Sequence, residues 1–171
     1  MNKPTIVFDN NTCKGYVTSL DLIRELDKKW FGRIEESKLV LDVVEVAYLI
    51  LKNKITIKVN DKKIESFNEF INTCYNCLKG FFWPNLIVYK DLRDRGRRVR
   101  VISDNKFLIK DKHGNLRIVI VLEEGSSRKA SSIYDDILTA NNNGLELVYA
   151  IVSLQGDLTY YEVSRIEPRR E

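Results

Sequence analysis

A run of basic residues lies between Val88 and Val101, where the sequence reads VYKDLRDRGRRVRV. From Lys90 to Arg100 this run holds six cations and two anions, and its surplus of four equals the formal net charge of the whole chain. Cations gathered on one surface can bind the phosphates of a nucleic acid. The same composition is also typical of the solvated side of a helix and a strand. The arrangement of the charges therefore has to distinguish a nucleic-acid-binding surface from an ordinary solvated one.

The charges in this run fall into two groups. In residues 90–95 arginine alternates with aspartate at helical spacing, and side chains three or four apart on a helix can form ion pairs. Arg97, Arg98 and Arg100 have no acidic neighbour in the sequence. Arg98 and Arg100 also share one side of a predicted strand. These three arginines are therefore the candidate contacts to nucleic-acid phosphates.

The cysteines offer a weaker candidate site. Cys74 and Cys77 have the spacing of half a zinc site, but the chain holds only one more cysteine, Cys13, and one histidine, His113. A structural zinc usually takes four such ligands. Cys74 also continues an apolar stripe at helical spacing, which favours a buried free cysteine. We therefore expect no metal and, in a cytoplasmic protein, no disulfide.

Composition sets the class of protein. The chain has 171 residues, of which 44% are hydrophobic and 30% charged, as is usual for a globular protein with a real core. The pI of about 8.9 is mildly basic and is weak evidence for an acidic partner. The N-terminus lacks the charged start and apolar middle of a signal peptide, so we expect a cytoplasmic protein.

Periodicity predicts a small mixed α/β module over residues 1–80. Helical spacing is found in residues 19–32, which end at a glycine, in residues 37–54, which are apolar on nearly all sides, and in residues 66–80. Ser66 and Glu69 have the spacing of a capping box at the start of the third helix. The alternation in residues 55–60 predicts a strand.

Residues 81–171 predict a second domain with a mixed β-sheet flanked by helices. The order is a helix (84–96), strands at 97–103, 106–110 and 116–123, a helix (131–144), and two strands about the turn Gln155–Asp157. Strand 116–123 is apolar over most of its length, which is typical of a strand covered on both faces. In the first helix Leu86, Tyr89 and Leu92 should face inward, whereas Arg93 should face out. The predicted fold class is therefore α/β (α+β).

Two segments carry a resemblance to a known family. VYKDLRDRG with the strands that follow it, and LVYAIVSLQGDLTYYEVSRI near the end, resemble the C-terminal domain of archaeal tRNA-splicing endonucleases. LVLDVVEVAYLILKNKI resembles the leucine-rich helix and strand of that family's N-terminal domain. The resemblance runs from about Lys14 to about Ile166. It implies metal-independent cleavage of precursor tRNA at a bulge-helix-bulge, with no cofactor, by a tyrosine, a histidine and a lysine.

The chain departs from the family at two of the three residues that do this chemistry, whereas the histidine belongs near Gly114, one residue from His113, and stays open. The tyrosine belongs near Ile109 or Lys110, yet no tyrosine occurs between Tyr89 and Tyr134. The lysine belongs near Leu145, yet no lysine follows Lys129. The resemblance therefore implies a structural subunit without catalytic residues, which pairs with a separate catalytic chain, two of each per assembly.

The resemblance also implies residues for subunit contact. Asp157, after Gly156, matches an acidic residue of the family that enters a basic groove on a neighbouring subunit. The glycine and aspartate also suit a plain hairpin turn. The final strand resembles the segment through which two subunits pair, and Tyr160 and Val163 should lie on its opposite sides. Whether Arg97, Arg98 and Arg100 contact RNA or a subunit stays open.

Two other activities remain as alternatives. The first is a self-sufficient splicing enzyme with displaced residues, Lys110 and His113, although a histidine in the predicted turn 111–115 is more typical of an exposed surface residue. The second is a metal-dependent nuclease of the restriction type, for which Glu123 and Glu124 supply carboxylates but lack the lysine two residues later. A binding module without an endonuclease partner is a further possibility.

Overall fold

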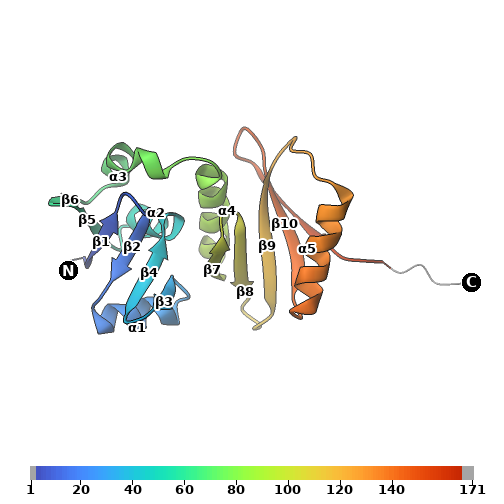
Figure 1. Ribbon diagram of the computed structural model, residues 1–171, viewed down its shortest axis with the longest axis horizontal. Coiled ribbons are helices and arrows are strands. Elements are labelled where there is room, and N and C mark those ends of the chain that lie inside the picture. The colour runs from blue at the N-terminus through green and yellow to red at the C-terminus, as the bar shows by residue number, and fades with distance from the viewer. Residues whose placement is uncertain (1–2, 167–171) are drawn as a thin grey trace, which may run out of the picture.

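Two β-sheets form the protein, one from each half of the chain, with a helix between them (Figure 1). This computed structural model describes residues 3–166. The N-terminal sheet has the strand order β3-β4-β2-β1-β5-β6, and the C-terminal sheet has the order β11-β10-β9-β8-β7. Both sheets are mixed and both carry helices, so the predicted fold class is confirmed.

The elements of the N-terminal half are β1 (Thr5–Asp9), β2 (Lys14–Val17), α1 (Leu20–Lys28), β3 (Arg33–Glu35), β4 (Lys38–Asp42), α2 (Val43–Leu51), β5 (Thr56–Val59), β6 (Lys62–Ile64), α3 (Phe67–Thr73) and the 3-10 helix η1 (Tyr75–Cys77). Those of the C-terminal half are α4 (Phe82–Asp94), β7 (Arg98–Ser103), β8 (Lys106–Lys110), β9 (Leu116–Glu123), α5 (Ala130–Asn142), β10 (Glu146–Val152) and β11 (Leu158–Val163).

The helix predicted at residues 37–54 is wrong in its first third. Residues 38–42 form strand β4, and the helix starts only after Asp42. The Asp42 carboxylate accepts a hydrogen bond from the Val44 N–H, and the Glu45 carboxylate accepts one from the Asp42 N–H. This capping box sets the start of α2. An apolar run fits a buried strand and a buried helix equally well, so periodicity alone missed the change.

Helix α1 ends earlier than its predicted stop at Gly32. It ends at Lys28, and Trp30 and Gly32 both have positive φ angles, of 64° and 66°. At Gly32 a Cβ atom would lie 2.6 Å from the Val40 carbonyl oxygen, so the chain passes too close to β4 for any side chain. Residues 5–17, which carried no predicted element, form the β1–β2 hairpin.

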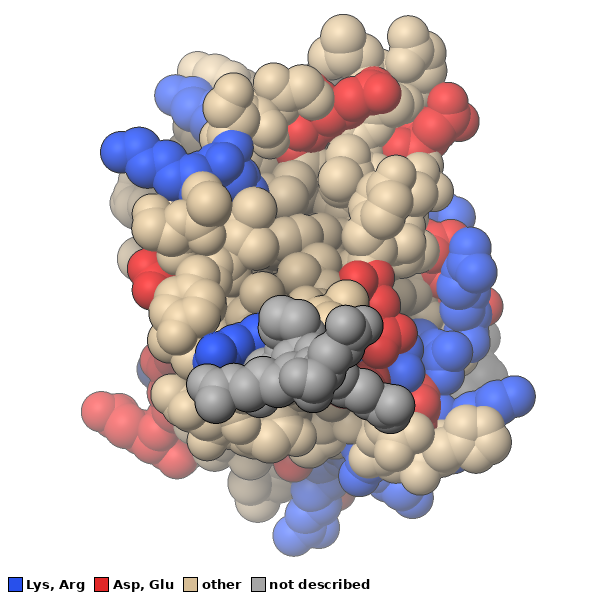
Figure 2. Space-filling view, turned by 90° about the vertical axis from the view of Figure 1, so that its right-hand side faces the viewer, with Lys and Arg blue, Asp and Glu red and all other residues tan. Residues whose placement is uncertain are grey.

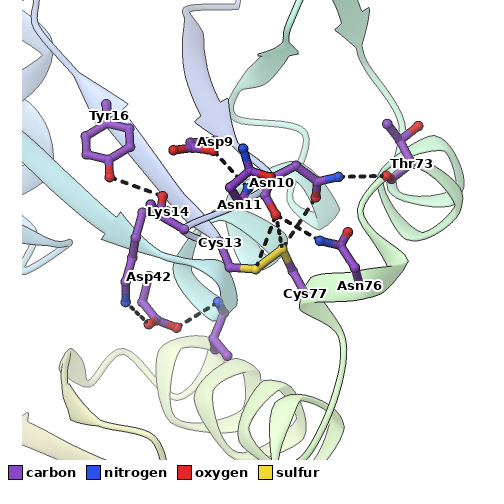
Figure 3. The surroundings of a disulfide bond; sticks show 12 residues. Asp9, Asn10, Asn11, Cys13, Lys14, Tyr16, Asp42, Thr73, Asn76 and Cys77 are labelled. Atoms are coloured by element: carbon purple, nitrogen blue, oxygen red, sulfur yellow. Dashed lines mark hydrogen bonds and ion pairs between the residues drawn. A yellow bond between two sulfur atoms is a disulfide. The ribbon is translucent and has the colours of Figure 1, made fainter.

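A disulfide joins Cys13 to Cys77, and the expectation of free cysteines is therefore wrong for these two residues. Their Cα atoms lie 5.5 Å apart although 64 positions separate them in sequence. Cys13 lies in the β1–β2 turn and Cys77 in η1, and only the folded chain brings these segments together (Figure 3). Cys74 is a buried free thiol, as expected.

The C-terminal sheet matches its prediction closely. Strand β9 lies between β8 and β10, antiparallel to the first and parallel to the second. Helix α4 lies on one side of this sheet and α5 on the other (Figure 1). Val119 and Val121 pack into the main core, whereas Ile120 packs into a second cluster with Ile137 of α5. Strand β9 is thus covered on both faces.

Arg93 corrects the prediction for α4. Leu86, Tyr89 and Leu92 are buried as expected, but Arg93 faces the N-terminal half rather than solvent. Its guanidinium donates to the carbonyl oxygens of Lys29, Trp30 and Val99, at 2.6, 2.8 and 2.6 Å. It also lies over the Phe31 ring, 3.8 Å from the ring centroid. Charge at helical spacing indicated a solvated side, but two of these acceptors, Lys29 and Trp30, lie more than sixty positions away in sequence.

Other polar contacts support the same junction. Asp94 of α4 accepts a hydrogen bond from the Tyr48 hydroxyl and forms an ion pair with Lys52. Tyr48 and Lys52 both belong to the N-terminal half. Buried side chains of both sheets form one continuous core cluster. The domain boundary at residue 80 therefore stays a prediction, since the two sheets on either side of it contribute to the same hydrophobic core.

Candidate functional site

One end of the C-terminal sheet gathers the positions to which the resemblance assigns the catalytic residues. Arg98 at the start of β7 pairs with Lys110 at the end of β8, and Lys110 pairs with Leu116 at the start of β9. Arg117 of β9 pairs in turn with Glu146 at the start of β10. The end of β8, the turn 111–115 and the start of β10 therefore lie at the same end of the sheet.

The turn 111–115 is built around Asp111. The Asp111 carboxylate accepts hydrogen bonds from the backbone N–H groups of His113 and Asn115, at 2.8 and 2.9 Å, and from the Asn115 side chain. Gly114 supplies the positive φ, 91°, that closes the turn. The aspartate is thus engaged by its own turn, and the His113 side chain is exposed beside it.

A cavity of about 450 Å³ opens at this end of the sheet. It is lined by Arg98, Lys110, Lys112 and His113, together with Gly96, Asp111 and Gly114. Three permanent cations thus face one carboxylate, and that carboxylate is already hydrogen-bonded within its turn. The surplus of positive charge suits a phosphate group. Lys110 and His113 are brought together here, as the displaced-site alternative requires.

The three candidate arginines have different surroundings. Arg98 is exposed and Arg97 half-buried, and neither side chain has a hydrogen bond or ion pair within residues 3–166. Arg100 forms an ion pair with Asp27, at 2.9 Å. The expectation that Arg100 lacks an acidic partner is therefore wrong, because Asp27 lies 73 positions away in sequence. Arg98 and Arg97 remain the arginines available to a ligand.

Trp30 is a neighbour of this site that the sequence did not indicate. The Arg100 guanidinium lies 5.3 Å and the Lys110 ammonium 5.8 Å from the centroid of its ring. Such cation–π contacts hold both cations against the N-terminal half. Trp30 follows α1 with a positive φ, and no local pattern links it to a strand 70 residues later.

The carboxylates of the restriction-type alternative lie elsewhere. Glu123 and Glu124 are exposed at the opposite end of β9 from the turn 111–115. In the part of the chain that the structure describes, no three histidine, cysteine or acidic side chains come close enough to hold a metal ion. No described helix has both the length and the apolar character needed to cross a membrane.

The β10–β11 hairpin presents the predicted subunit-contact residues. Gly156 has a φ of 87°, and the Asp157 N–H donates to the Ser153 hydroxyl at 3.0 Å. These contacts hold the turn and leave Asp157 exposed, and Leu154 of the same turn has an exposed fraction of 95%. A fixed turn with an acidic and an apolar side chain at its tip suits insertion into a neighbouring surface.

Strand β11 forms one edge of the C-terminal sheet. The Tyr160 hydroxyl donates to Asp91 of α4 at 2.7 Å, and burial with this hydrogen bond raises the pKa of Tyr160 above its usual range. Val163 packs instead against the cluster under α5. The two residues therefore lie on opposite sides of the sheet, as predicted, and the outer backbone edge of β11 is not paired within residues 3–166.

Figure 2 views the molecule from the side of the C-terminal sheet and α5. An uncharged area lies in the upper middle of this view, and acidic and basic side chains lie around it, some of them near the middle of the view. Apolar or uncharged surface with a charged rim is the usual anatomy of a protein interface.

Comparison with known proteins gives the same family over both halves. Residues 11–71 match the tRNA intron endonuclease N-terminal domain, and residues 82–160 match the tRNA intron endonuclease catalytic C-terminal domain. A tRNA-splicing endonuclease of Thermococcus kodakarensis is 30% identical over 82% of this chain and 86% of its own length. One of Thermococcus gammatolerans is 30% identical over 92% of this chain and 96% of its own length.

Another relative is a larger protein. The tRNA-splicing endonuclease of Methanosarcina acetivorans is 30% identical over 88% of this chain, but the chain spans only 44% of its length. The two family domains together cover most of the sequence. Each of them corresponds to one of the two sheets described above. The chain belongs to the tRNA-splicing endonuclease family.

Proposed function

We propose that this chain is the structural, non-catalytic subunit of a tRNA-splicing endonuclease. It pairs with a homologous chain that carries the tyrosine, histidine and lysine of the family, two of each in a heterotetramer. The assembled enzyme removes introns from precursor tRNA at bulge-helix-bulge motifs, without a metal ion, in the cytoplasm. This chain supports assembly and contributes to RNA binding.

The observation that carries the proposal is the composition of the sheet end. The family's tyrosine position, at the end of β8, holds Ile109 and Lys110, and its lysine position, before β10, holds Leu145. Neither a phenol to take the proton of the 2′-hydroxyl nor an ammonium at the start of β10 is present. A reaction that needs a positioned base and a cation at the developing charge lacks both at these positions.

The hairpin and β11 support the assembly role. Asp157 is exposed on a turn whose backbone is held by Ser153, which suits a carboxylate that docks into a basic groove. The free edge of β11 suits pairing with a second strand. In the complex with the catalytic chain, Asp157→Asn should lower the fraction of heterotetramer at low protein concentration. Sedimentation that is unchanged at every dilution would exclude a role for Asp157 in assembly.

Arg97 and Arg98 support the RNA-binding role, because both lack partners within the described chain. Arg98→Glu in the assembled enzyme should weaken RNA binding and reduce the slope of log affinity against log salt by about one. Lys62→Glu, on β6 at the far edge of the other sheet (Figure 1), is the matched control. If the two variants bind RNA equally well, Arg98 does not contact it.

Cleavage assays decide between this proposal and its alternatives. The purified chain is incubated with a bulge-helix-bulge RNA, with and without EDTA, alone and together with a candidate catalytic chain. We expect cleavage only with the catalytic chain, and no effect of EDTA. Cleavage by the chain alone that EDTA abolishes would favour the metal-dependent nuclease with Glu123 and Glu124.

A self-sufficient splicing enzyme is the second candidate, because Lys110 and His113 line one cavity with Arg98. EDTA-resistant cleavage by the chain alone would favour it, provided that His113→Ala abolishes that cleavage. Co-purification from a native extract tests the remaining alternative. A binding module without an endonuclease would bring down no chain with the three catalytic residues.

A further inference from the structure

The disulfide joins the first hairpin to the segment that leads into α4. Cys13 ends the turn between β1 and β2, and Cys77 closes η1, five residues before α4 begins at Phe82. The far end of α4 is held to the N-terminal half by Arg93. The start of α4 is therefore tethered by a covalent bond, and its end by hydrogen bonds.

Hydrogen bonds beside the disulfide hold the same two segments together (Figure 3). The Asn10 side chain donates to the Thr73 carbonyl oxygen, and the Asn76 side chain donates to the Asn10 carbonyl oxygen at 2.8 Å. These bonds do not depend on the sulfur atoms. Opening the disulfide would therefore loosen the contact between the hairpin and η1 without removing it.

The surroundings of Cys77 also accommodate a thiol. Its sulfur lies 3.4 Å from the backbone oxygen of Asn10 and 3.4 Å from the side-chain oxygen of the same residue. The bonded sulfur carries no proton, so these contacts become hydrogen bonds only after reduction, when an S–H can donate. The site thus has partners ready for the reduced form as well as the oxidised one.

A reductant can reach the bond from the surface. Cys13 is half-buried, whereas the exposed fraction of Cys77 is 8%, and both line a cavity of about 580 Å³ with Lys14, Lys79 and Phe81. Because Cys13 is the more exposed residue of the pair, we expect attack at its sulfur, which leaves Cys77 as the departing thiolate beside Asn10. Access and the leaving group are two of the factors that set exchange rates.

The third cysteine does not compete for the bond. Cys74 lies three residues before Cys77 but is buried, and burial raises the pKa of its thiol to about 11. A thiol with such a pKa is almost entirely protonated at neutral pH, and only the thiolate attacks a disulfide. Internal exchange is therefore suppressed, and the redox state of the pair depends on external thiols.

We propose that Cys13 and Cys77 form a reversible redox site for a dithiol protein of the thioredoxin class, and that its state sets how firmly the start of α4 is held. One thiolate of the dithiol attacks the Cys13 sulfur and breaks the S–S bond, and Cys77 leaves as a thiolate and takes a proton. The second thiol of the dithiol then displaces Cys13. The dithiol is oxidised by two electrons, and both cysteines of this chain become thiols.

Counting thiols on the native protein tests the exchange. After alkylation in denaturant the untreated chain should carry one label, on Cys74. After the native chain is treated with thioredoxin, thioredoxin reductase and NADPH it should carry three, and oxidised glutathione should restore one. A thioredoxin variant without its second active-site cysteine should be trapped on Cys13. Three labels before treatment, reduction only in denaturant, or trapping on Cys77 would each overturn the proposal.

Hydrogen exchange tests the consequence for α4. Amides in residues 74–86 of the reduced native protein should exchange about tenfold faster or more, whereas those of β9 should keep their rates. Cys74→Ser, which leaves the disulfide in place, is the matched control and should behave as the oxidised wild type. Equal exchange at residues 74–86 in the oxidised and reduced proteins would show that the bond does not hold the helix.

Discussion

Replacing Arg93 should separate the two halves of the protein more than any other single change on α4. Its guanidinium reaches three backbone carbonyl oxygens, two of them in the loop after α1 and one, from Val99, in β7. It also donates to the Tyr89 hydroxyl and lies on the Phe31 ring. Within residues 3–166, no other side chain of α4 donates hydrogen bonds to both halves of the chain.

The magnitude follows from the acceptors left behind. A hydrogen bond to a charged group contributes about 1.5–3 kcal/mol, and a buried acceptor without a donor costs about 1–3 kcal/mol. Water can reach some of these carbonyls, because Arg93 is only partly buried. We therefore expect Arg93→Ala to lower the free energy of unfolding by about 3–5 kcal/mol. That loss corresponds to a fall in Tm on the order of 10 °C for a chain of this size.

Urea unfolding followed by circular dichroism and by tryptophan fluorescence measures this loss. Arg95→Ala is the matched control, since Arg95 directly follows the last residue of this helix, is exposed, and within residues 3–166 pairs only with Asp91. It should change stability by no more than about 0.5 kcal/mol. Arg93→Lys keeps the charge but lacks the planar guanidinium, so it should recover only part of the loss.

Two results would refute this reasoning. If Arg93→Ala and Arg95→Ala have the same stability, the contacts of Arg93 do not hold the halves together. If Arg93→Lys is as stable as wild type, charge rather than the geometry of the guanidinium matters. Where Arg93→Ala fails to fold, the comparison of Arg93→Lys with Arg95→Ala still decides, because lysine retains the side-chain volume.

Three further predictions concern stability. The double variant Cys13→Ser, Cys77→Ser should have a free energy of unfolding about 4 kcal/mol lower than wild type, because the disulfide closes a loop of some 64 residues. In urea titrations, wild type in reductant should have the same stability as this variant. Gly32→Ala should lower the free energy of unfolding by at least about 2 kcal/mol more than Gly96→Ala, because both glycines have positive φ but only at Gly32 would a Cβ atom meet backbone. Thermal unfolding of the two variants measures the difference. Burial raises the pKa of Glu45 from 4.5 to about 7, so the free energy of unfolding of wild type should fall by up to about 3 kcal/mol as the pH rises from 4.5 to 7. In urea titrations over that range, the stability of Glu45→Gln should depend less on pH.

Local sequence patterns predicted the C-terminal sheet well. The apolar run in β9 indicated a strand with helices on both faces, and Gly156 with Asp157 indicated the turn of the last hairpin. The Ser66–Glu69 capping box also starts α3 as expected, with the Glu69 N–H donating to the Ser66 hydroxyl. These features succeed because each depends on residues within one element or one turn.

The failures share a different cause. Lys29, which Arg93 bonds in the N-terminal half, lies 64 positions away in sequence, and the partners of Arg100 and Cys13 lie 73 and 64 positions away. Charge spacing on a helix predicts solvent exposure only if no other element covers that side, and a cysteine reveals its partner only in the fold. The junction between the two sheets was therefore outside the reach of local patterns, although it positions β7 and with it the cavity at Arg98.

The site itself explains how the family scaffold can exist without the catalytic residues. Lys110 and His113 lie at the end of the sheet and are partly buried and exposed, so exchanging their side chains removes little from the apolar core. Substitutions at such positions usually change stability by less than about 0.5 kcal/mol. Tyr160, by contrast, packs against the main core and bonds to α4, and its loss would affect folding. Side chains at the end of the sheet can therefore change while those that serve packing are retained, as the proposed role of a structural subunit requires.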